Sequence, residues 1–211
     1  MDDDITKSNY ETSNDWHVQK SLAHSWAKQL DTFLRFGGFK PTKVLDAGCG
    51  GSGRDIQQFR ERGIQVEGFD YSHAAIESLR KQFPDGKFYE GNLLNTGLTD
   101  ETYDGIWACA SIPNLKRNEV YKTLAEFWRI LTPRGKLFIS VKEGEGERMV
   151  PDAAGERFFS FYSEMELQNV VEKAGFKVDH TEIIPYTWNT WTTKEEGTTL
   201  PNWVCLYALK S

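Results

Sequence analysis

The sequence has few cysteines and no long apolar run, and both absences narrow what the protein can be. Its three cysteines, Cys49, Cys109 and Cys205, do not form the CxxC spacing of a metal or redox pair. We therefore expect reduced thiols and no metal site. The least polar stretch, residues 105–112, is far shorter than the ~20 residues that a helix needs to cross a bilayer. We expect no membrane span.

Positive charge is also in short supply. The chain has 25 Lys and Arg against 31 Asp and Glu, a net charge of −6, which disfavours nucleic-acid partners unless the basic residues gather on one face. It opens with the acidic, polar MDDDITKSN, whereas a secretory signal has a basic start and then an apolar run. At 211 residues the chain has the length of one domain. These features predict a cytoplasmic, single-domain protein that is a monomer or a homodimer.

The middle of the chain alternates short runs rich in β-branched and aromatic residues with longer stretches of helical periodicity, which is typical of a parallel sheet covered by helices. The predicted strands are residues 43–47, 64–70, 87–90, 103–110 and 135–141. The predicted helices between them are residues 54–62, 72–82 and 118–131.

The two ends of the chain extend this core. Residues 15–36 have apolar side chains three or four apart, which predicts one or two amphipathic helices packed across the sheet edge. Residues 163–175 read as a helix, and residues 176–184 and 203–210 as two more strands, the last too close to its predecessor for a helical crossover. The fold class is therefore α/β: a doubly wound, mostly parallel seven-stranded sheet with helices on both faces and a C-terminal antiparallel hairpin strand.

A glycine-rich turn stands between the first predicted strand and its helix. The segment VLDAGCGGSGRD, residues 44–55, places Gly48, Gly50 and Gly53 where the backbone must turn sharply and approach a ligand closely. Asp70 ends the next predicted strand, where a carboxylate can hold the hydroxyls of a ribose. The pattern fits a dinucleotide or S-adenosylmethionine, since both lay an adenosine across the carboxyl ends of such strands.

Three features favour S-adenosylmethionine over a nicotinamide dinucleotide. The carboxylate of Asp46, just before the glycines, suits the ammonium and sulfonium of that ligand and would repel a pyrophosphate. The antiparallel hairpin at the end of the sheet is the second feature. The third is that the chain has no YxxxK pair and no room for a separate substrate domain.

These residues resemble the class I, Rossmann-like S-adenosylmethionine-dependent methyltransferases, in particular the small bacterial ubiquinone-biosynthesis-methyltransferase-like group. The resemblance covers about residues 40–210. Its carriers are VLDAGCGGSGRD, GFDYS at 68–72, GNLL at 91–94, YDGIWACASIPNL at 103–115, FWRILTPRGKLFISVKEGEGE at 127–147 and ERFFSFYSEMELQNVVEKAGF at 156–176. It implies a single methyltransferase domain made of an N-terminal helical cap (1–40), a cofactor-binding core (41–142) and a substrate-side C-terminal part (143–211).

The resemblance also implies a cofactor site. Its members would be Asp46, Gly48, Cys49 and Gly50 at the methionine, Gly53 in the same loop, Asp70 at the ribose, Tyr71, Asn92 and Leu93 at the adenine, and Ala108 at the end of the fourth strand. Many relatives have Asp where this chain has Asn92, and Asn keeps an acceptor while adding a donor.

The substrate side is less well defined. Many relatives have His where this chain has Asn114, and because Asn takes no proton at neutral pH the resemblance supplies no general base. Candidates for substrate contact are Trp16 and His17 in the leading helix, Lys142 at the end of the fifth strand, and Trp188 and Trp191 in a polar loop. The two loop tryptophans suit either substrate contact or the cover of a core edge.

The hypothesis that follows is methyl transfer by in-line displacement to O, N or S of a small molecule whose nucleophile is already reactive at neutral pH. One alternative is a tRNA wobble-uridine methyltransferase, which RFFSFY and the terminal NWVCLYALK faintly resemble. The basic residues Lys20, Lys28, Arg35, Lys40, Arg157 and Lys194 are scattered along the sequence, which argues against it. The other alternative is a non-catalytic, cofactor-binding partner subunit.

Overall fold

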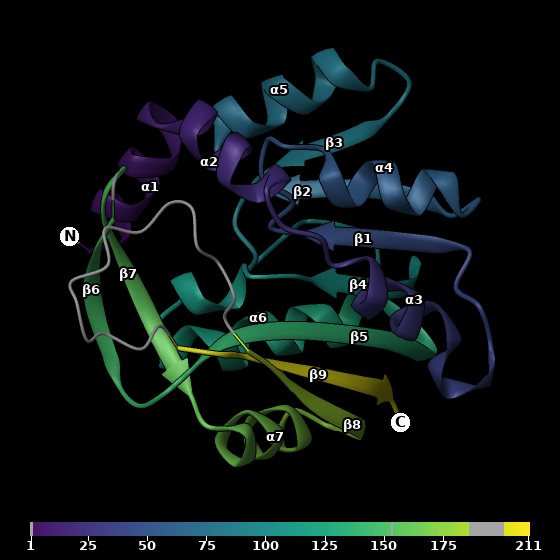
Figure 1. Ribbon diagram of the computed structural model, residues 1–211. Coiled ribbons are helices and arrows are strands. Elements are labelled where there is room, and N and C mark those ends of the chain that lie inside the picture. The colour runs from purple at the N-terminus through teal and green to yellow at the C-terminus, as the bar shows by residue number, and fades with distance from the viewer. Residues whose placement is uncertain (1, 153, 186–200) are drawn as a thin grey trace.

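The computed structural model describes residues 2–152, 154–185 and 201–211. Five parallel strands form the centre of the sheet, in the order β3-β2-β1-β4-β5 (Figure 1). They are β1 (Lys43–Ala47), β2 (Gln65–Asp70), β3 (Lys87–Glu90), β4 (Tyr103–Ala108) and β5 (Leu131–Glu143). The last strand of the chain, β9 (Trp203–Lys210), runs antiparallel to β5, and β8 (Phe176–Ile184) runs antiparallel to β9. The α/β fold, its mostly parallel sheet and its C-terminal antiparallel hairpin strand are confirmed.

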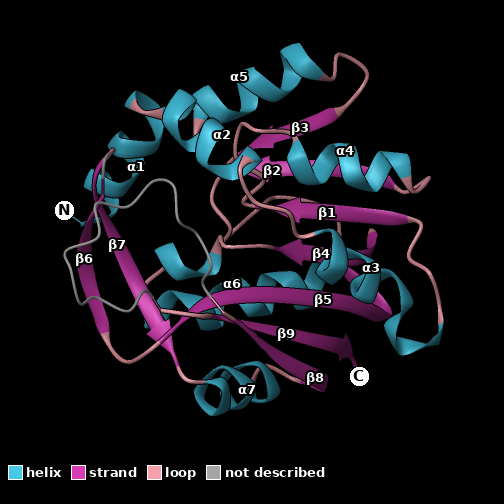
Figure 2. Cartoon of the chain, in the orientation of Figure 1, coloured by secondary structure: helices cyan, strands magenta, loops and turns pink. Residues whose placement is uncertain are grey.

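Helices cover both faces of this sheet (Figure 2). One face packs against α3 (Ala27–Arg35), α4 (Arg54–Glu61) and α5 (His73–Gln82), and the other against α6 (Arg117–Ile130) and α7 (Glu164–Lys173). Successive residues of a strand point to opposite faces, so Val44 joins the first apolar cluster and its neighbour Leu45 the second. A short 3-10 helix, η1 (Phe36–Gly38), leads from α3 toward β1.

Local sequence signals set the helix ends. The hydroxyl of Ser72 accepts a hydrogen bond from the Ala75 N–H at the start of α5. Ser163 and Glu166 form a reciprocal capping box at the start of α7. Such caps satisfy backbone donors that have no partner inside the helix, and they explain why these two helices begin at the predicted residues.

A two-stranded hairpin beyond the end of β5 was not predicted, so the described residues form a nine-stranded sheet rather than the predicted seven-stranded one. Its strands are β6 (Glu147–Asp152) and β7 (Gly155–Tyr162), and β7 pairs with β5 through Lys142 to Phe161 and Glu143 to Tyr162. Glycines and charges between residues 143 and 156 obscured the β6 strand in the sequence. Because the hairpin extends past the carboxyl ends of the parallel strands, it provides a wall beside the sheet edge where ligands bind in such folds.

The N-terminal cap, α1 (Asp2–Thr12) and α2 (Asn14–Leu22), faces this hairpin across the carboxyl ends of β1, β2 and β4 (Figure 1). The prediction of one or two helices in residues 15–36 is confirmed by α2 and α3, and α3 packs on the sheet, whereas α2 buries none of its side chains. The first helix, α1, was not predicted, and it contacts β7 and α5. The amphipathic pattern predicted helix correctly, but it could not tell a helix that covers a sheet from one that covers a cavity.

Three expectations from the sequence concern membrane spans, the cysteines and metal sites. In residues 2–152, 154–185 and 201–211 no helix is both long and apolar enough to span a bilayer. The three cysteines are free thiols. The same ranges hold no cluster of metal-ligating side chains.

Replacing Trp107 with Phe should destabilise the fold measurably. The fully buried indole of Trp107 stacks on Phe138 with ring centres 3.9 Å apart, and its N–H donates to Asp55 Oδ2 over 3.0 Å. Losing that bond and leaving a small void should lower the free energy of unfolding by ~1–3 kcal/mol, measured by urea titration. Tyr121→Phe, at a residue that is 44% exposed, should change it by less than ~0.5 kcal/mol. Equal urea midpoints for the two variants would contradict the packing described here.

Candidate functional site

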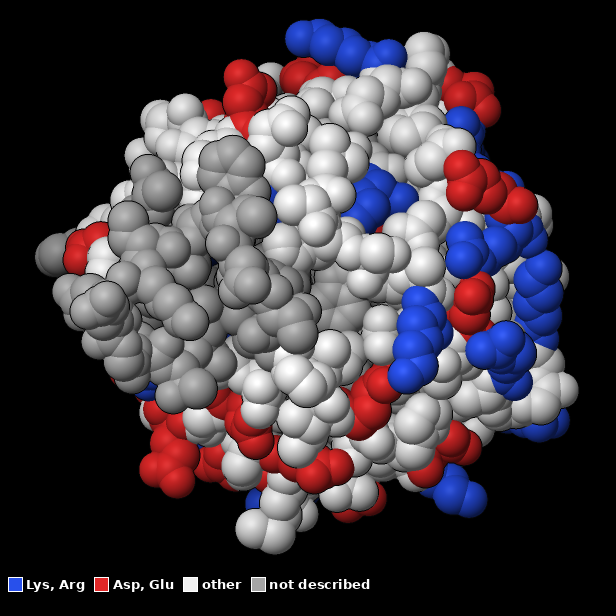
Figure 3. All heavy atoms as spheres, in the orientation of Figure 1, with Lys and Arg blue, Asp and Glu red and all other residues white. Residues whose placement is uncertain are grey.

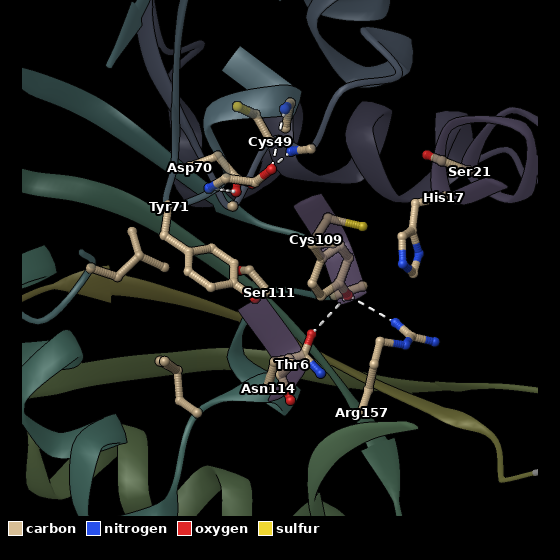
Figure 4. A pocket seen from close by; sticks show the side chains of 18 of the residues that line it. Thr6, His17, Ser21, Cys49, Asp70, Tyr71, Cys109, Ser111, Asn114 and Arg157 are labelled. Atoms are coloured by element: carbon tan, nitrogen blue, oxygen red, sulfur yellow. Dashed lines mark hydrogen bonds between the residues drawn. The ribbon is translucent and has the colours of Figure 1, made fainter. Parts of the chain in front are cut away.

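A cavity of about 430 Å³ lies at the carboxyl ends of the parallel strands, within the ~300–1,000 Å³ usual for small-molecule sites. The loops after β1, β2 and β4 form one side of it, and the N-terminal cap, the β6–β7 hairpin and the end of β5 form the other. Figure 4 shows Cys49 and Asp70 at one end of the pocket and Asn114 and Arg157 at the other.

The glycine-rich turn after β1 needs glycine at its first position. Gly48 has φ of 80°, and a Cβ there would lie 2.2 Å from Cβ of Ser111. Its N–H donates to the carbonyl of Phe69 over 2.7 Å, which ties the turn to β2. Any side chain at Gly48 would therefore force apart the loops after β1 and β4, which both line the cavity.

The carboxylate of Asp70 joins the loops after β1 and β2. Its Oδ2 accepts from the Gly50 N–H over 2.8 Å, and its Oδ1 accepts from the Ser72 N–H over 2.9 Å. Burial raises the pKa of Asp70, and these backbone hydrogen bonds oppose that shift. Each carboxylate oxygen keeps a further lone pair, so Asp70 can still accept hydrogen bonds from a ligand.

Asp46 and Asp55 both line the cavity, and Arg54 lies close enough for its charge to lower the pKa of Asp46. Arg54 donates two hydrogen bonds of 2.7 Å to the Asp55 carboxylate. Asp46 is 3% exposed, and burial, followed by the charge of Asp55, raises its pKa well above the usual range. In the ranges that the structure describes, no group donates a hydrogen bond to the Asp46 carboxylate. A ligand cation at this position would offset the cost of burying this carboxylate.

Two further polar atoms of the cavity lining lack partners among the described residues. They are the hydroxyls of Tyr71 and Ser111, and both are buried. A buried polar group without a partner costs ~1–3 kcal/mol. Nearby, Asn92 Oδ1 accepts from the Leu94 N–H over 2.9 Å, which directs its amide nitrogen away from that turn. These groups can hydrogen-bond a polar ligand.

A hydrogen-bonded chain crosses the other end of the cavity. Arg157 Nη1 donates to the Tyr10 hydroxyl over 2.8 Å, and that hydroxyl donates to Asn114 Oδ1 over 3.0 Å (Figure 4). Asn114 lies in the 3-10 helix η2 (Ile112–Asn114) and donates through Nδ2 to the carbonyl of Phe158 over 2.8 Å. Asn114 is thus fixed between the cap and the hairpin, where it can orient a ligand but not take its proton.

Lys142 lies near the end of β5, where it pairs with Phe161 of β7 and Trp203 of β9. Its Nζ lies 3.9 Å from the centre of the Trp203 ring. Burial, followed by the charges of Lys20 and Arg157, lowers the pKa of Lys142 to about 6. An amine with this pKa is mostly uncharged at neutral pH and can accept a proton. This shift could not be predicted from the sequence, because Lys20 and Arg157 come from distant segments.

The cap is fastened on both sides of the cavity. Glu11 accepts from the N–H groups of His73 (2.6 Å) and Ala74 (3.0 Å) at the start of α5. On the hairpin side, Asn9 Nδ2 donates to the carbonyl of Ala154 over 2.7 Å, and the Thr6 hydroxyl accepts from the Phe158 N–H over 2.9 Å. These contacts hold the cap against the two sides of the cavity.

Most of the residues that the sequence predicted for the site line this cavity. They are Asp46, Gly48, Cys49, Gly50, Asp70, Tyr71, Asn92, Leu93, His17, Asn114 and Lys142. Burial raises the pKa of the Cys49 thiol well above its usual value, so this cysteine lines the wall as a neutral group. His17 also contacts Asn9, whose Oδ1 lies 2.7 Å from its Nε2.

Three predicted residues lie outside the cavity lining. Gly53 faces α5, since a Cβ on it would meet Phe83 at 2.5 Å. Ala108 is fully buried in the apolar cluster that contains α6 and α7. Trp16 packs beside His17 and Lys20 instead. Trp188 and Trp191 lie outside the described residues.

Several residues of the lining were not predicted, among them Tyr10, Arg54, Trp26 and Trp203. Tyr10 lies in a helix that was not predicted. Arg54 directly follows Gly53, the last glycine of the motif, and begins α4. This position was its only signal in the sequence.

A family model and the curated relatives both indicate a methyltransferase domain. The family described as "Methyltransferase domain" matches residues 45–139. Demethylmenaquinone methyltransferase of Renibacterium salmoninarum is 25% identical over 140 residues, which are 66% of this chain and 56% of that protein. The next curated match covers 53% of its protein, so the chain spans about half the length of the curated relatives it matches.

Two solved structures share the fold. The 1,6-didemethyltoxoflavin-N1-methyltransferase of Burkholderia thailandensis, solved with 1,6-didemethyltoxoflavin and S-adenosylhomocysteine, has a TM-score of 0.74 and 21% identity, over 98% of this chain and 88% of that one. A SAM-dependent methyltransferase of Methanosarcina mazei has a TM-score of 0.70 and 17% identity, over 86% of this chain and 96% of that one.

The amine of Lys142 should titrate far below an ordinary lysine. NMR of protein labelled at lysine Cε should show one resonance with a midpoint near pH 6, because burial and two neighbouring cations disfavour the ammonium form. Lys142→Gln should remove that resonance and so assign it. A Lys142 signal that stays in the ammonium form through neutral pH would disprove the electrostatics described here.

Proposed function

Because this chain belongs to the class I, Rossmann-like S-adenosylmethionine-dependent methyltransferases, we propose that it transfers a methyl group from S-adenosylmethionine to an oxygen, nitrogen or sulfur atom of a small molecule. The proposed domain plan assigns residues 1–40 to the cap, 41–142 to the cofactor core and 143–211 to the substrate side.

The buried carboxylate of Asp46 is the observation that carries this proposal. It opens into the cavity beside the glycine turn, and Arg54 is engaged by Asp55 instead. The ammonium and sulfonium of S-adenosylmethionine are cations of the kind that this position favours. The pyrophosphate of a nicotinamide dinucleotide would bring negative charge to the same carboxylate, so this site disfavours a dinucleotide.

The remaining groups fit the rest of the cofactor. Asp70 retains lone pairs for the ribose hydroxyls, and Gly48 and Gly50 allow the backbone to approach the methionine. Tyr71, Asn92 and Leu93 line the cavity beyond Asp70, where an adenine ring would lie. When bound, the cofactor supplies an electrophilic methyl group.

The substrate half of the cavity suits a small molecule. It is bounded by the cap and the hairpin, whose hydrogen bonds close it on two sides. Figure 3 shows Lys and Arg interspersed with Asp and Glu over the described part of one face, rather than a continuous basic surface for RNA. Both features favour the small-molecule hypothesis over the tRNA alternative.

The residues of this half can position and desolvate the reacting atom. Methyl transfer needs the nucleophile, methyl and sulfur in line and away from water, and no covalent enzyme intermediate. In the proposed arrangement, Asn114 and Tyr10 orient the substrate, while Trp26 and Trp203 exclude water.

Calorimetric titration tests the cofactor directly. We expect S-adenosylmethionine to bind with micromolar affinity and NADH not to bind. Asp70→Ala and Asp46→Asn should each weaken binding at least ~10-fold, or ~1.4 kcal/mol, by removing the ribose acceptor and the countercharge. The matched control is Asp85→Asn, since Asp85 is exposed and pairs only with Arg60 on the surface.

Two results would count against the proposal. Preference for NADH, or no binding of S-adenosylmethionine, would refute the cofactor assignment. Tight binding without turnover on any metabolite extract, together with co-purification of a larger enzyme, would favour the partner-subunit alternative.

A further inference from the structure

Three basic side chains from distant parts of the chain meet in the substrate half of the cavity. Lys20 comes from α2, Lys142 from the end of β5 and Arg157 from β7, and all three line the same cavity. The charges of Lys20 and Arg157 both lower the pKa of Lys142. The basic residues that looked scattered in the sequence therefore include two that gather at one site.

A neighbouring histidine reports the same positive potential. Burial, followed by the charges of Arg54, Lys20 and Lys142, lowers the pKa of His24 to about 3. His24 is buried at the end of α2, where its Nδ1 lies 3.1 Å from the carbonyl of Lys20. The lowered pKa values of His24 and Lys142 therefore both indicate that a further positive charge is unfavourable at this site.

Most of the acidic residues of the lining lie on one side of the cavity. Among the described lining residues, Asp46, Asp55 and Asp70 stand on the side of the glycine turn, and Glu119 is bonded to the N–H of Lys116 at the start of α6. The acidic side suits the cationic end of the cofactor, and the basic side remains for the second ligand.

Aromatic and apolar groups surround the three cations. The Trp203 ring lies against Lys142 at 3.9 Å, and the Phe159 ring lies 5.1 Å from the Arg157 guanidinium. Trp26 meets Trp203 edge to face with ring centres 5.5 Å apart. Such a pocket offers a large apolar contact area with charge at a few defined points.

We propose that Lys20, Lys142 and Arg157 form an anion subsite, and that the methyl-accepting molecule is an organic acid with an apolar, ring-containing body. The role of this molecule as methyl acceptor rests on the proposed function, but the anion subsite does not depend on cofactor binding. The acidic group of the substrate contacts the cations, and its apolar body lies among Trp26, Trp203 and Phe159.

Binding of an acid should be coupled to proton uptake. Among the described residues, the charges of Lys20 and Arg157 act on Lys142, and the charge of Lys142 acts on His24. In the free protein, Lys142 is mostly neutral slightly above pH 7, because its pKa is about 6. A bound anion favours the ammonium form and raises this pKa, so the amine takes a proton from the solvent.

The test compares two probes of the same shape, 2-naphthoate and 2-naphthamide, by calorimetry slightly above neutral pH. It is run with the protein alone and with saturating S-adenosylhomocysteine, in two non-anionic buffers of different ionisation enthalpy. We expect the acid to bind at least about tenfold tighter than the amide, as a charge-assisted contact implies. We also expect the acid, but not the amide, to bind with an uptake approaching ~1 proton per site.

Variants separate the anion subsite from general damage to the fold. Lys142→Met and Arg157→Met should each remove most of the preference for the acid while leaving S-adenosylmethionine affinity within about twofold. Lys142→Arg should keep the preference and abolish proton uptake, because guanidinium is charged throughout this range. Lys122→Met, at an exposed position of α6, is the matched control and should change neither.

Equal affinity for acid and amide, or no measurable binding of the acid with or without S-adenosylhomocysteine, would overturn the anion subsite. If S-adenosylhomocysteine binds in that experiment, the proposed function stands and only this inference fails. If the acid is preferred but S-adenosylhomocysteine does not bind, the subsite stands and the proposed cofactor fails.

Discussion

The hydrogen bonds of the Asp70 carboxylate hold together the two loops on which the site is built. By accepting from Gly50 on one loop and Ser72 on the other, Asp70 fixes the spacing between the ends of β1 and β2. The glycine turn needs this support because Gly48 and Gly50 both have positive φ, and glycine loses more conformational freedom on folding than any other residue. The same carboxylate is then available to a ligand, so stability of the turn and binding depend on one side chain.

The substrate half of the site is assembled from three separate segments. The cap and the β6–β7 hairpin hold each other through Thr6, Asn9 and Tyr10, and η2 joins them through Asn114. Loops and added elements carry specificity while the sheet carries the shared chemistry. Three carboxylates, Asp46, Asp55 and Asp70, lie in or next to the loops after β1 and β2, whereas Lys20 and Arg157 lie on the added elements.

The sequence predicted the parts of the molecule whose signals are local. Strands 43–47 and 87–90 and the caps at Ser72 and Ser163 were predicted at the observed residues, because burial, turn chemistry and capping act within a few positions. The hairpin was missed because β6 is half charged, and α1 because its opening residues read as a polar terminus. The meeting of Lys20, Lys142 and Arg157 depends on tertiary contacts between the cap, β5 and β7, which no local pattern records.

The central claim is methyl transfer to a small acid, and isotope transfer tests it most directly. The protein would be incubated with S-adenosylmethionine that carries a deuterated methyl group and with a metabolite extract separated into anionic and non-anionic fractions. Mass spectrometry would then locate the labelled methyl group. The account predicts labelled products from the anionic small-molecule fraction, at a rate that does not require strongly alkaline pH. Label found only in RNA or protein, or only in the non-anionic fraction, would contradict it.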